Sequence, residues 1–138
     1  MSNINIYFSA SIKGGRMLVD TYKIMIEELK RYGNVLTEHI GDANYAKVGF
    51  LPAKEVYDKD ISLLRNSNIV IAEISVPSLG VGYELAFAEK LEIPTYCFYK
   101  SGSTVSSMII GDDYFKCSAY ESCDEFAEIF NKIFNKYN

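Results

Sequence analysis

The sequence lacks the features that would mark a membrane protein, a nucleic-acid binder or a metalloprotein. No apolar stretch in its 138 residues approaches the roughly 18–20 residues of a membrane-spanning helix. The net charge is −4 and there is no long basic run, so the chain offers no basic face to the phosphate backbone of a nucleic acid. Three cysteines and one histidine, without metal-type spacing, predict reduced thiols and no metal or other cofactor.

The N-terminal residues contain no basic segment followed by an apolar stretch, so we expect no signal peptide and a cytoplasmic location. The length is that of a single domain, residues 1–138, with one core. Within it, short apolar runs alternate with helical patterns. The expected strands are 3–9, 34–39, 69–74, 94–99 and 114–119, and the expected helices are 17–32, 53–66, 83–91 and 124–134.

This alternation predicts the fold. Strands that alternate with helices form parallel sheets with right-handed crossovers, so we expect an α/β, flavodoxin-like, doubly wound, mostly parallel five-stranded sheet flanked by helices. Residues 41–52 show no firm periodicity, and we expect them to form a loop over the site.

The segment 69–88 is the most informative part of the chain. An apolar strand is followed by Pro77 and two glycines, and a helical pattern starts near Tyr83. In open α/β sheets, ligands bind where a strand ends in such a turn before a helix. We expect Glu84 at the start of that helix, where free backbone N–H groups and the helix dipole keep a carboxylate ionised. Glu84 could then be a nucleophile or a ligand clamp, or it could only stabilise the first helical turn.

Other strand ends should meet at the same edge. The loop 11–16 contains two glycines, a hydroxyl and two cations, which suit an anion, but it matches neither a Walker A loop nor the dinucleotide fingerprint. A tight turn with solvated Lys13 and Arg16 explains the same residues. Asp60 lies on the helix 53–66, where a solvated helix face is the default. If Asp60 and Glu84 converge on one sugar, they could divide nucleophilic and proton-transfer roles, as in retaining glycosidases.

Three blocks carry a family resemblance: YFSASIKGGR at 7–16, YGNVLTEH at 32–39 and PSLGVGYE at 77–84. Together they resemble the 2'-deoxynucleoside 5'-phosphate N-hydrolases of the nucleoside 2-deoxyribosyltransferase superfamily, in register from Ile4 to Tyr120. The resemblance implies a homodimer that hydrolyses the N-glycosidic bond of deoxynucleoside 5'-monophosphates. The products would be a free nucleobase and 2-deoxyribose 5-phosphate, formed through a covalent glycosyl-enzyme intermediate without a cofactor.

The resemblance also implies roles for individual residues. Glu84 matches the nucleophile, Asp60 the acid/base carboxylate and Tyr7 the active-site tyrosine near the sugar. The positions implied around the substrate are Ser11, Lys13, Gly14, Arg16, Ser78 and Gly80 at the phosphate, Ser106 reaching the phosphate from the neighbouring subunit, and Ile12 and His39 at the nucleobase. Lys13 stands where the hydrolases usually have arginine, and Ala10 where they have glycine.

Three alternatives stay open on the sequence. The enzyme could be a nucleoside 2-deoxyribosyltransferase, which passes the sugar to a second base, or a ribonucleotide N-glycosidase of the CMP type. A nucleotide-sensing module would bind without turnover, and we expect such a module to lack one of the two carboxylates. A receiver-like phosphoacceptor domain would need clustered acids after the first strand, where Ser9 and Ser11 stand instead.

Overall fold

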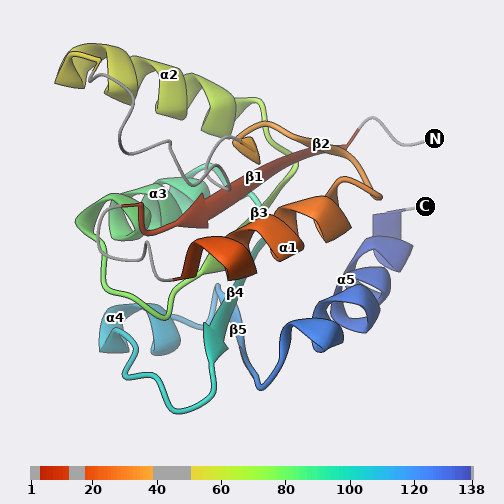
Figure 1. Ribbon diagram of the computed structural model, residues 1–138. Coiled ribbons are helices and arrows are strands. Elements are labelled where there is room, and N and C mark those ends of the chain that lie inside the picture. The colour runs from red at the N-terminus through yellow and green to blue at the C-terminus, as the bar shows by residue number, and fades with distance from the viewer. Residues whose placement is uncertain (1–3, 13–17, 39–50, 138) are drawn as a thin grey trace.

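The computed structural model describes residues 4–12, 18–38 and 51–137 (Figure 1). The strands are β1 (Asn5–Ala10), β2 (Asn34–Val35), β3 (Ile69–Glu73), β4 (Thr95–Lys100) and β5 (Lys116–Tyr120). The helices are α1 (Val19–Leu29), α2 (Ala53–Arg65), α3 (Leu79–Lys90), α4 (Ser107–Ile110) and α5 (Phe126–Phe134), with 3₁₀ turns η4 (Cys123–Glu125) and η5 (Asn135–Tyr137).

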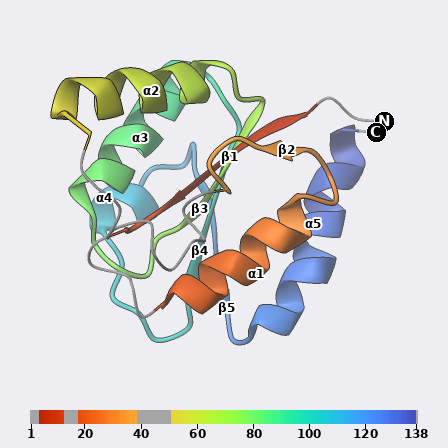
Figure 2. The ribbon, with the colours of Figure 1, turned by 45° about the horizontal axis from the view of Figure 1, so that its top comes forward.

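The strands form one sheet in the order β2-β1-β3-β4-β5, and every pairing is parallel. The chain therefore winds first to one side of β1 and then to the other, which is the predicted flavodoxin-like arrangement. Helices α1 and α5 cover one face of the sheet, while α2 and α3 cover the opposite face (Figure 2). In the part of the chain that is described, no helix has both the length and the apolar character needed to cross a membrane.

Strand β1 serves both faces of the sheet because successive side chains of a strand point in opposite directions. Ile6 and Phe8 pack into the core beneath α1 and α5, whereas Tyr7 packs into the core beneath α2 and α3. Ser9 follows Tyr7 by two residues and so shares its face. The alternation places two hydroxyl groups of β1 opposite α3.

The second strand is shorter than predicted. Pairing with β1 ends at Val35, where 34–39 had been expected to form a strand. The hydroxyl of Thr37 both accepts from the Phe8 N–H at 2.8 Å and donates to the Phe8 carbonyl at 2.7 Å. One side chain thus satisfies the backbone groups that a longer β2 would have paired. The predicted loop 41–52 lies outside the described residues.

The third helix begins earlier than predicted, at Leu79 instead of Tyr83. Ser78 caps it, with an extended backbone and with its hydroxyl accepting from the Val81 N–H at 3.2 Å. Gly80 and Gly82 therefore belong to the helix and not to the turn before it. A further short helix, α4, follows the predicted polar loop and is capped by Ser106.

Candidate active site

The centre of the site is the carboxylate of Glu84, which α3 directs toward β1. The Tyr7 hydroxyl donates to Oε2 of Glu84 at 2.8 Å, and the Ser9 hydroxyl donates to Oε1 at 2.8 Å. Both donors are almost completely buried. Each carboxylate oxygen is thus held by one donor from the same strand. The sequence predicted Tyr7 and Glu84 but missed Ser9, which the two-residue alternation of β1 could have indicated.

The environment of Glu84 differs from the expected one. Glu84 lies in the second turn of α3, six residues after the capping Ser78, so the prediction that it begins the helix is wrong. The field of a helix terminus is strongest in its first turn, and it cannot be the main influence here. Burial instead raises the pKa of Glu84, the hydrogen bonds from Ser9 and Tyr7 oppose the rise, and the negative charge of Asp60 adds to it.

Asp60 is the second carboxyl group of the site. It is half-buried on α2, and burial raises its pKa while the neighbouring Lys59 lowers it. The ring centroids of Tyr57 on α2 and Tyr83 on α3 lie 6.2 Å apart, and the rings are nearly perpendicular. Tyr57 lies one helical turn before Asp60 and Tyr83 directly precedes Glu84, so this contact packs the two helices together near both carboxyl groups. The described residues supply two hydrogen-bond donors to Glu84 and none to Asp60. This difference favours the anion on Glu84 and the retained proton on Asp60.

The first turns of α3 are unusually open. A β-carbon added at Gly80 would meet only the Ser78 hydroxyl, at 3.8 Å, and one added at Gly82 would meet nothing within 4 Å. Glycine inside a helix costs about 1 kcal/mol relative to alanine, and the packing of residues 4–12, 18–38 and 51–137 does not require it here. The backbone at the start of α3 is therefore accessible to a molecule from outside, next to free N–H groups that suit an anion.

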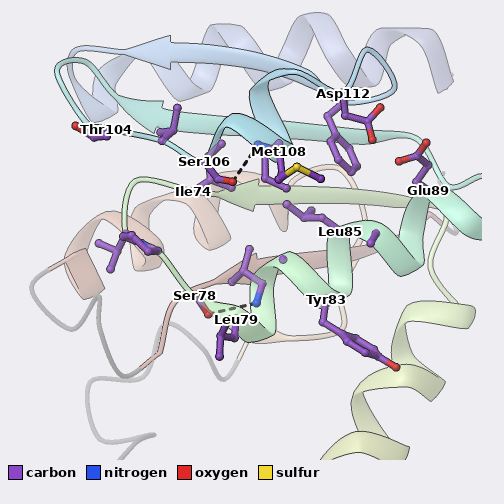
Figure 3. A pocket seen from close by; sticks show the side chains of 18 residues that line it. Ile74, Ser78, Leu79, Tyr83, Leu85, Glu89, Thr104, Ser106, Met108 and Asp112 are labelled. Atoms are coloured by element: carbon purple, nitrogen blue, oxygen red, sulfur yellow. Dashed lines mark hydrogen bonds between the residues drawn. The ribbon is translucent and has the colours of Figure 1, made fainter.

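A groove of about 800 Å³ runs between α3 and α4 (Figure 3). Ser78 lies on the α3 wall of this groove and Ser106 on the α4 wall, where the Ser106 hydroxyl accepts from the Met108 N–H at 3.2 Å. Apolar side chains dominate the lining. Leu79 is 97% exposed and Met108 is 81% exposed, so the groove presents uncovered apolar surface beside two serines.

The structure locates the remaining predicted residues less completely. Ser11 directly follows β1 and is almost fully buried. Ile12, two residues after the carboxyl end of β1, is partly buried and packs against the core beneath α1 and α5. The other predicted positions, Lys13, Gly14, Arg16 and His39, lie outside the described residues. Within the described ranges, no group of three or more His, Cys, Asp or Glu side chains could hold a metal ion.

Comparison with known proteins identifies relatives of this chain. The family model for nucleoside 2-deoxyribosyltransferases matches residues 6–133. A protein of Methanococcoides burtonii, provisionally named 2'-deoxynucleoside 5'-phosphate N-hydrolase 1, is 38% identical over 113 residues, covering 80% of this chain and 93% of that protein. The 5-hydroxymethyl-dUMP N-hydrolase of Danio rerio is 41% identical over 115 residues, covering 78% of each chain.

A solved structure also shares the fold. The CMP N-glycosidase of Clostridium botulinum superimposes with a TM-score of 0.66 over 94% of this chain and 98% of that one, at 14% identity. At this low identity the likeness concerns the architecture alone. The family match, by contrast, spans nearly all of the chain, from β1 to α5. The chain belongs to the nucleoside 2-deoxyribosyltransferase family.

Proposed function

We propose that this protein is an N-glycosidase that hydrolyses 2'-deoxynucleoside 5'-monophosphates to a free nucleobase and 2-deoxyribose 5-phosphate. The observation that carries the proposal is the Glu84 carboxylate, held at both oxygens by Tyr7 and Ser9 and close enough to Asp60 to feel its charge. The names of relatives about 40% identical, which refer to hydrolases of deoxynucleoside monophosphates, support the substrate class.

The first chemical step is a displacement at the sugar. A carboxylate oxygen of Glu84 forms a bond to C1' while the bond between C1' and the base nitrogen breaks. The electron pair of the broken bond goes to the base, which takes a proton from the Asp60 carboxyl. Burial raises the pKa of Asp60, which suits a group that must still hold a proton near neutral pH.

The second step returns Glu84 to its starting state. Water adds to C1', the ester bond to Glu84 breaks, and the proton of the water passes to Asp60. Tyr7 and Ser9 hold Glu84 in one orientation through both steps. Two smaller barriers replace one large barrier, which is the general advantage of a covalent intermediate.

The phosphate of the substrate would bind at the start of α3. Among the described residues, a β-carbon at Gly80 would meet only the Ser78 hydroxyl, and the first turn of a helix offers N–H groups that suit an anion. We assign Ser11, Lys13, Gly14 and Arg16 to the same phosphate on the family resemblance. On the same ground we assign Ile12 and His39 to the nucleobase.

We further infer a homodimer in which the groove between α3 and α4 receives a second copy. The groove is apolar and uncovered, and Ser78 and Ser106 face it from opposite walls. A two-fold contact would bring Ser106 of one copy to the phosphate near Ser78 of the other. A cytoplasmic location fits the three cysteines, which are all free thiols.

The activity is tested by chromatographic detection of free base. The wild-type protein is incubated separately with dGMP, deoxyguanosine and GMP, each with and without a second base. Base release from dGMP alone supports the proposal. Release only when a second base is present would indicate a transferase, and a preference for GMP would indicate a ribonucleotide N-glycosidase. Binding of dGMP without any release would indicate a sensing module.

The dimer is tested by mixing two defective variants. Ser106→Asp keeps a good helix cap for α4 but repels a phosphate, and Glu84→Gln removes the nucleophile. If Ser106 acts in the neighbouring site, a mixed dimer contains one native site, so a 1:1 mixture should recover about a quarter of wild-type activity. If Ser106 acts within its own subunit, the mixture stays as inactive as its components. Sedimentation of an active monomer would contradict the dimer directly.

A further inference from the structure

Glu73 is a completely buried carboxylate that the proposed reaction does not use. It ends β3, and its side chain lies on the face of the sheet opposite Glu84, because Ala72 and Ile74 on either side of it pack beneath α2 and α3. A buried carboxylate is costly unless hydrogen bonds compensate it. The contacts of Glu73 therefore indicate what it stabilises.

Three donors reach Glu73. The Ser75 N–H donates to Oε1 at 2.9 Å, the Ser75 hydroxyl donates to Oε2 at 2.6 Å, and the Tyr120 hydroxyl donates to Oε2 in a short hydrogen bond. Burial, followed by the hydrogen bond to Glu73 and the charge of Glu73, raises the pKa of Tyr120, so its hydroxyl remains a proton donor. The carboxylate thus joins the turn after β3 to the end of β5.

The same cluster holds the loop after β4. The Ser75 hydroxyl accepts from the Lys100 N–H at 2.8 Å, and the Tyr120 carbonyl accepts from the Ser101 N–H at 2.8 Å. Ser75 lies three residues before Ser78, and Ser101 lies five residues before Ser106. The Glu73 cluster therefore holds the first residues of two segments, 75–78 and 101–106, which end at the groove residues Ser78 and Ser106 (Figure 3).

We propose that Glu73 is a positioning residue for recognition of the 5'-phosphate, because it fixes the separation of the segments that carry Ser78 and Ser106. The inference rests on the proposed function, in which these serines bind phosphate. In the proposed homodimer, Ser78 contacts the phosphate in the site of its own subunit, and Ser106 contacts the phosphate in the site of the neighbouring subunit. The Glu73 cluster of one subunit therefore positions one phosphate contact in each of the two sites. Glu73 touches no reacting atom, and its effect passes through Ser75 and Tyr120.

The test compares two tyrosines that each donate one hydrogen bond at opposite ends of the sheet. Tyr120→Phe removes a donor to Glu73, whereas Tyr114→Phe removes a donor to the Ile93 carbonyl at 2.7 Å, near the start of β4. Glu73→Gln is the second test variant. In this variant the Ser75 N–H, which can only donate, keeps the glutamine amide oxygen as its acceptor. The glutamine NH₂ group then faces the hydroxyls of Tyr120 and Ser75. It cannot accept their hydrogen bonds, and the Ser75 hydroxyl already accepts one from the Lys100 N–H.

We expect Tyr120→Phe to raise KM for dGMP about threefold to tenfold, Glu73→Gln to raise it more, and kcat to stay within about twofold. Tyr114→Phe should lower the melting temperature about as much as Tyr120→Phe does, because each variant loses one hydrogen bond, but it should leave KM unchanged. Equal KM in all three variants, or a loss confined to kcat, would overturn the role of Glu73.

A failure of the proposed reaction is separable from a failure of this inference. If the wild-type protein releases no base, calorimetric binding of 2-deoxyribose 5-phosphate to the same proteins decides the matter. Weaker binding by Tyr120→Phe and Glu73→Gln, but not by Tyr114→Phe, supports the positioning role. Equal affinities, or no binding by any of the proteins, overturn it.

Discussion

The two faces of the sheet are built from the same strands but differ in chemistry. Beneath α1 and α5 the space is filled by large aromatic rings, such as Phe98, Phe126 and Phe130, with ring centroids 5.3 to 6.1 Å apart. Beneath α2 and α3 the core near the sheet uses smaller residues, including Ala72 and Ala88. Each face also contains a carboxylate held by hydrogen bonds: Glu73, held by three, lies on the aromatic face, and Glu84, held by two, lies on the other.

The contrast is sharpest within β1, where Phe8 and Ser9 are neighbours and both are completely buried. Phe8 contacts the ring of Tyr22 on α1, and Ser9 donates to Glu84 on α3. Aromatic packing stabilises the fold, while the desolvation of the Glu84 carboxylate opposes it. We therefore expect the aromatic rings to contribute most of the stability and Glu84 to reduce stability in favour of the reaction.

The largest expected effect comes from removing the negative charge of Glu84. Glu84→Gln keeps the side-chain shape but removes the nucleophile, so base release should fall by about 10³-fold or more. Burial raises the pKa of Glu84 above its value in the unfolded chain, so ionising this carboxyl costs the folded state stability, which is lost as pH rises from the ordinary glutamate pKa through the raised one. The variant should therefore melt above the wild type at pH 7, and the gain should vanish below about pH 4.

Chromatography of free base and thermal melts at the two pH values check this prediction. Near wild-type turnover would exclude Glu84 as the nucleophile. A lower melting temperature of the variant at pH 7 would mean that the hydrogen bonds from Tyr7 and Ser9 outweigh the desolvation of the carboxylate.

The next effect concerns the aromatic face. Phe130 is fully buried between Phe98 and Phe126, so Phe130→Ala should lower the free energy of unfolding by about 3–5 kcal/mol. Phe130→Leu should cost about 1–2 kcal/mol and keep the protein folded for assays. Urea titration measures the loss. Turnover per folded molecule should stay at the wild-type level, and a parallel fall in kcat would show that the two faces are coupled.

The sequence predicted the sheet because local patterns determine it. The apolar strand before Pro77 is a signal within a few residues, and the parallel sheet followed from the helices that alternate with the strands. The start of α3 was missed because Gly80 and Gly82 are typical turn residues, and only the capping by Ser78 shows that they are helical. The end of β2 depended on Thr37, whose partner Phe8 lies 29 residues away.

The same limit applies to the site. Glu84 was singled out by the strand–turn–helix pattern of segment 69–88, whereas the roles of Tyr7 and Asp60 came from a family resemblance, and the roles of all three in the reaction remain predictions. Ser9 and Glu73 were missed because their hydrogen-bond partners lie 75 and 47 residues away in the chain. The alternation of β1 places Ser9 on the same face as Tyr7, but it does not identify Glu84 as the partner of Ser9. Contacts of this kind follow only from the packing of α3 on β1 and from the pairing of strands.

A smaller effect tests how the hydrogen bond from Ser9 influences the pKa of Glu84. Ser9→Ala leaves Oε1 of Glu84 without its donor, so the pKa of Glu84 should rise further. The ionised carboxylate is the active form, and the acid limb of the kcat/KM profile should therefore move up by about one pH unit. Ser67→Ala, which removes a hydroxyl that donates to the Leu63 carbonyl, is the matched control and should leave the limb in place. An unshifted limb in Ser9→Ala would contradict a contribution of the Ser9 hydrogen bond to the ionisation of Glu84.

The smallest expected effect separates stability from binding on a single helix. Gly80→Ala adds a methyl group to open space and should stabilise α3 by up to about 1 kcal/mol. If the space is kept for the substrate phosphate, the methyl group should also raise KM for dGMP about threefold to tenfold without changing kcat. Ser62→Ala, on the exposed side of α2, should raise stability slightly and leave KM unchanged. A more stable Gly80→Ala protein with wild-type KM would mean that the open start of α3 serves neither phosphate nor activity, and the phosphate site would then have to lie elsewhere at this edge of the sheet.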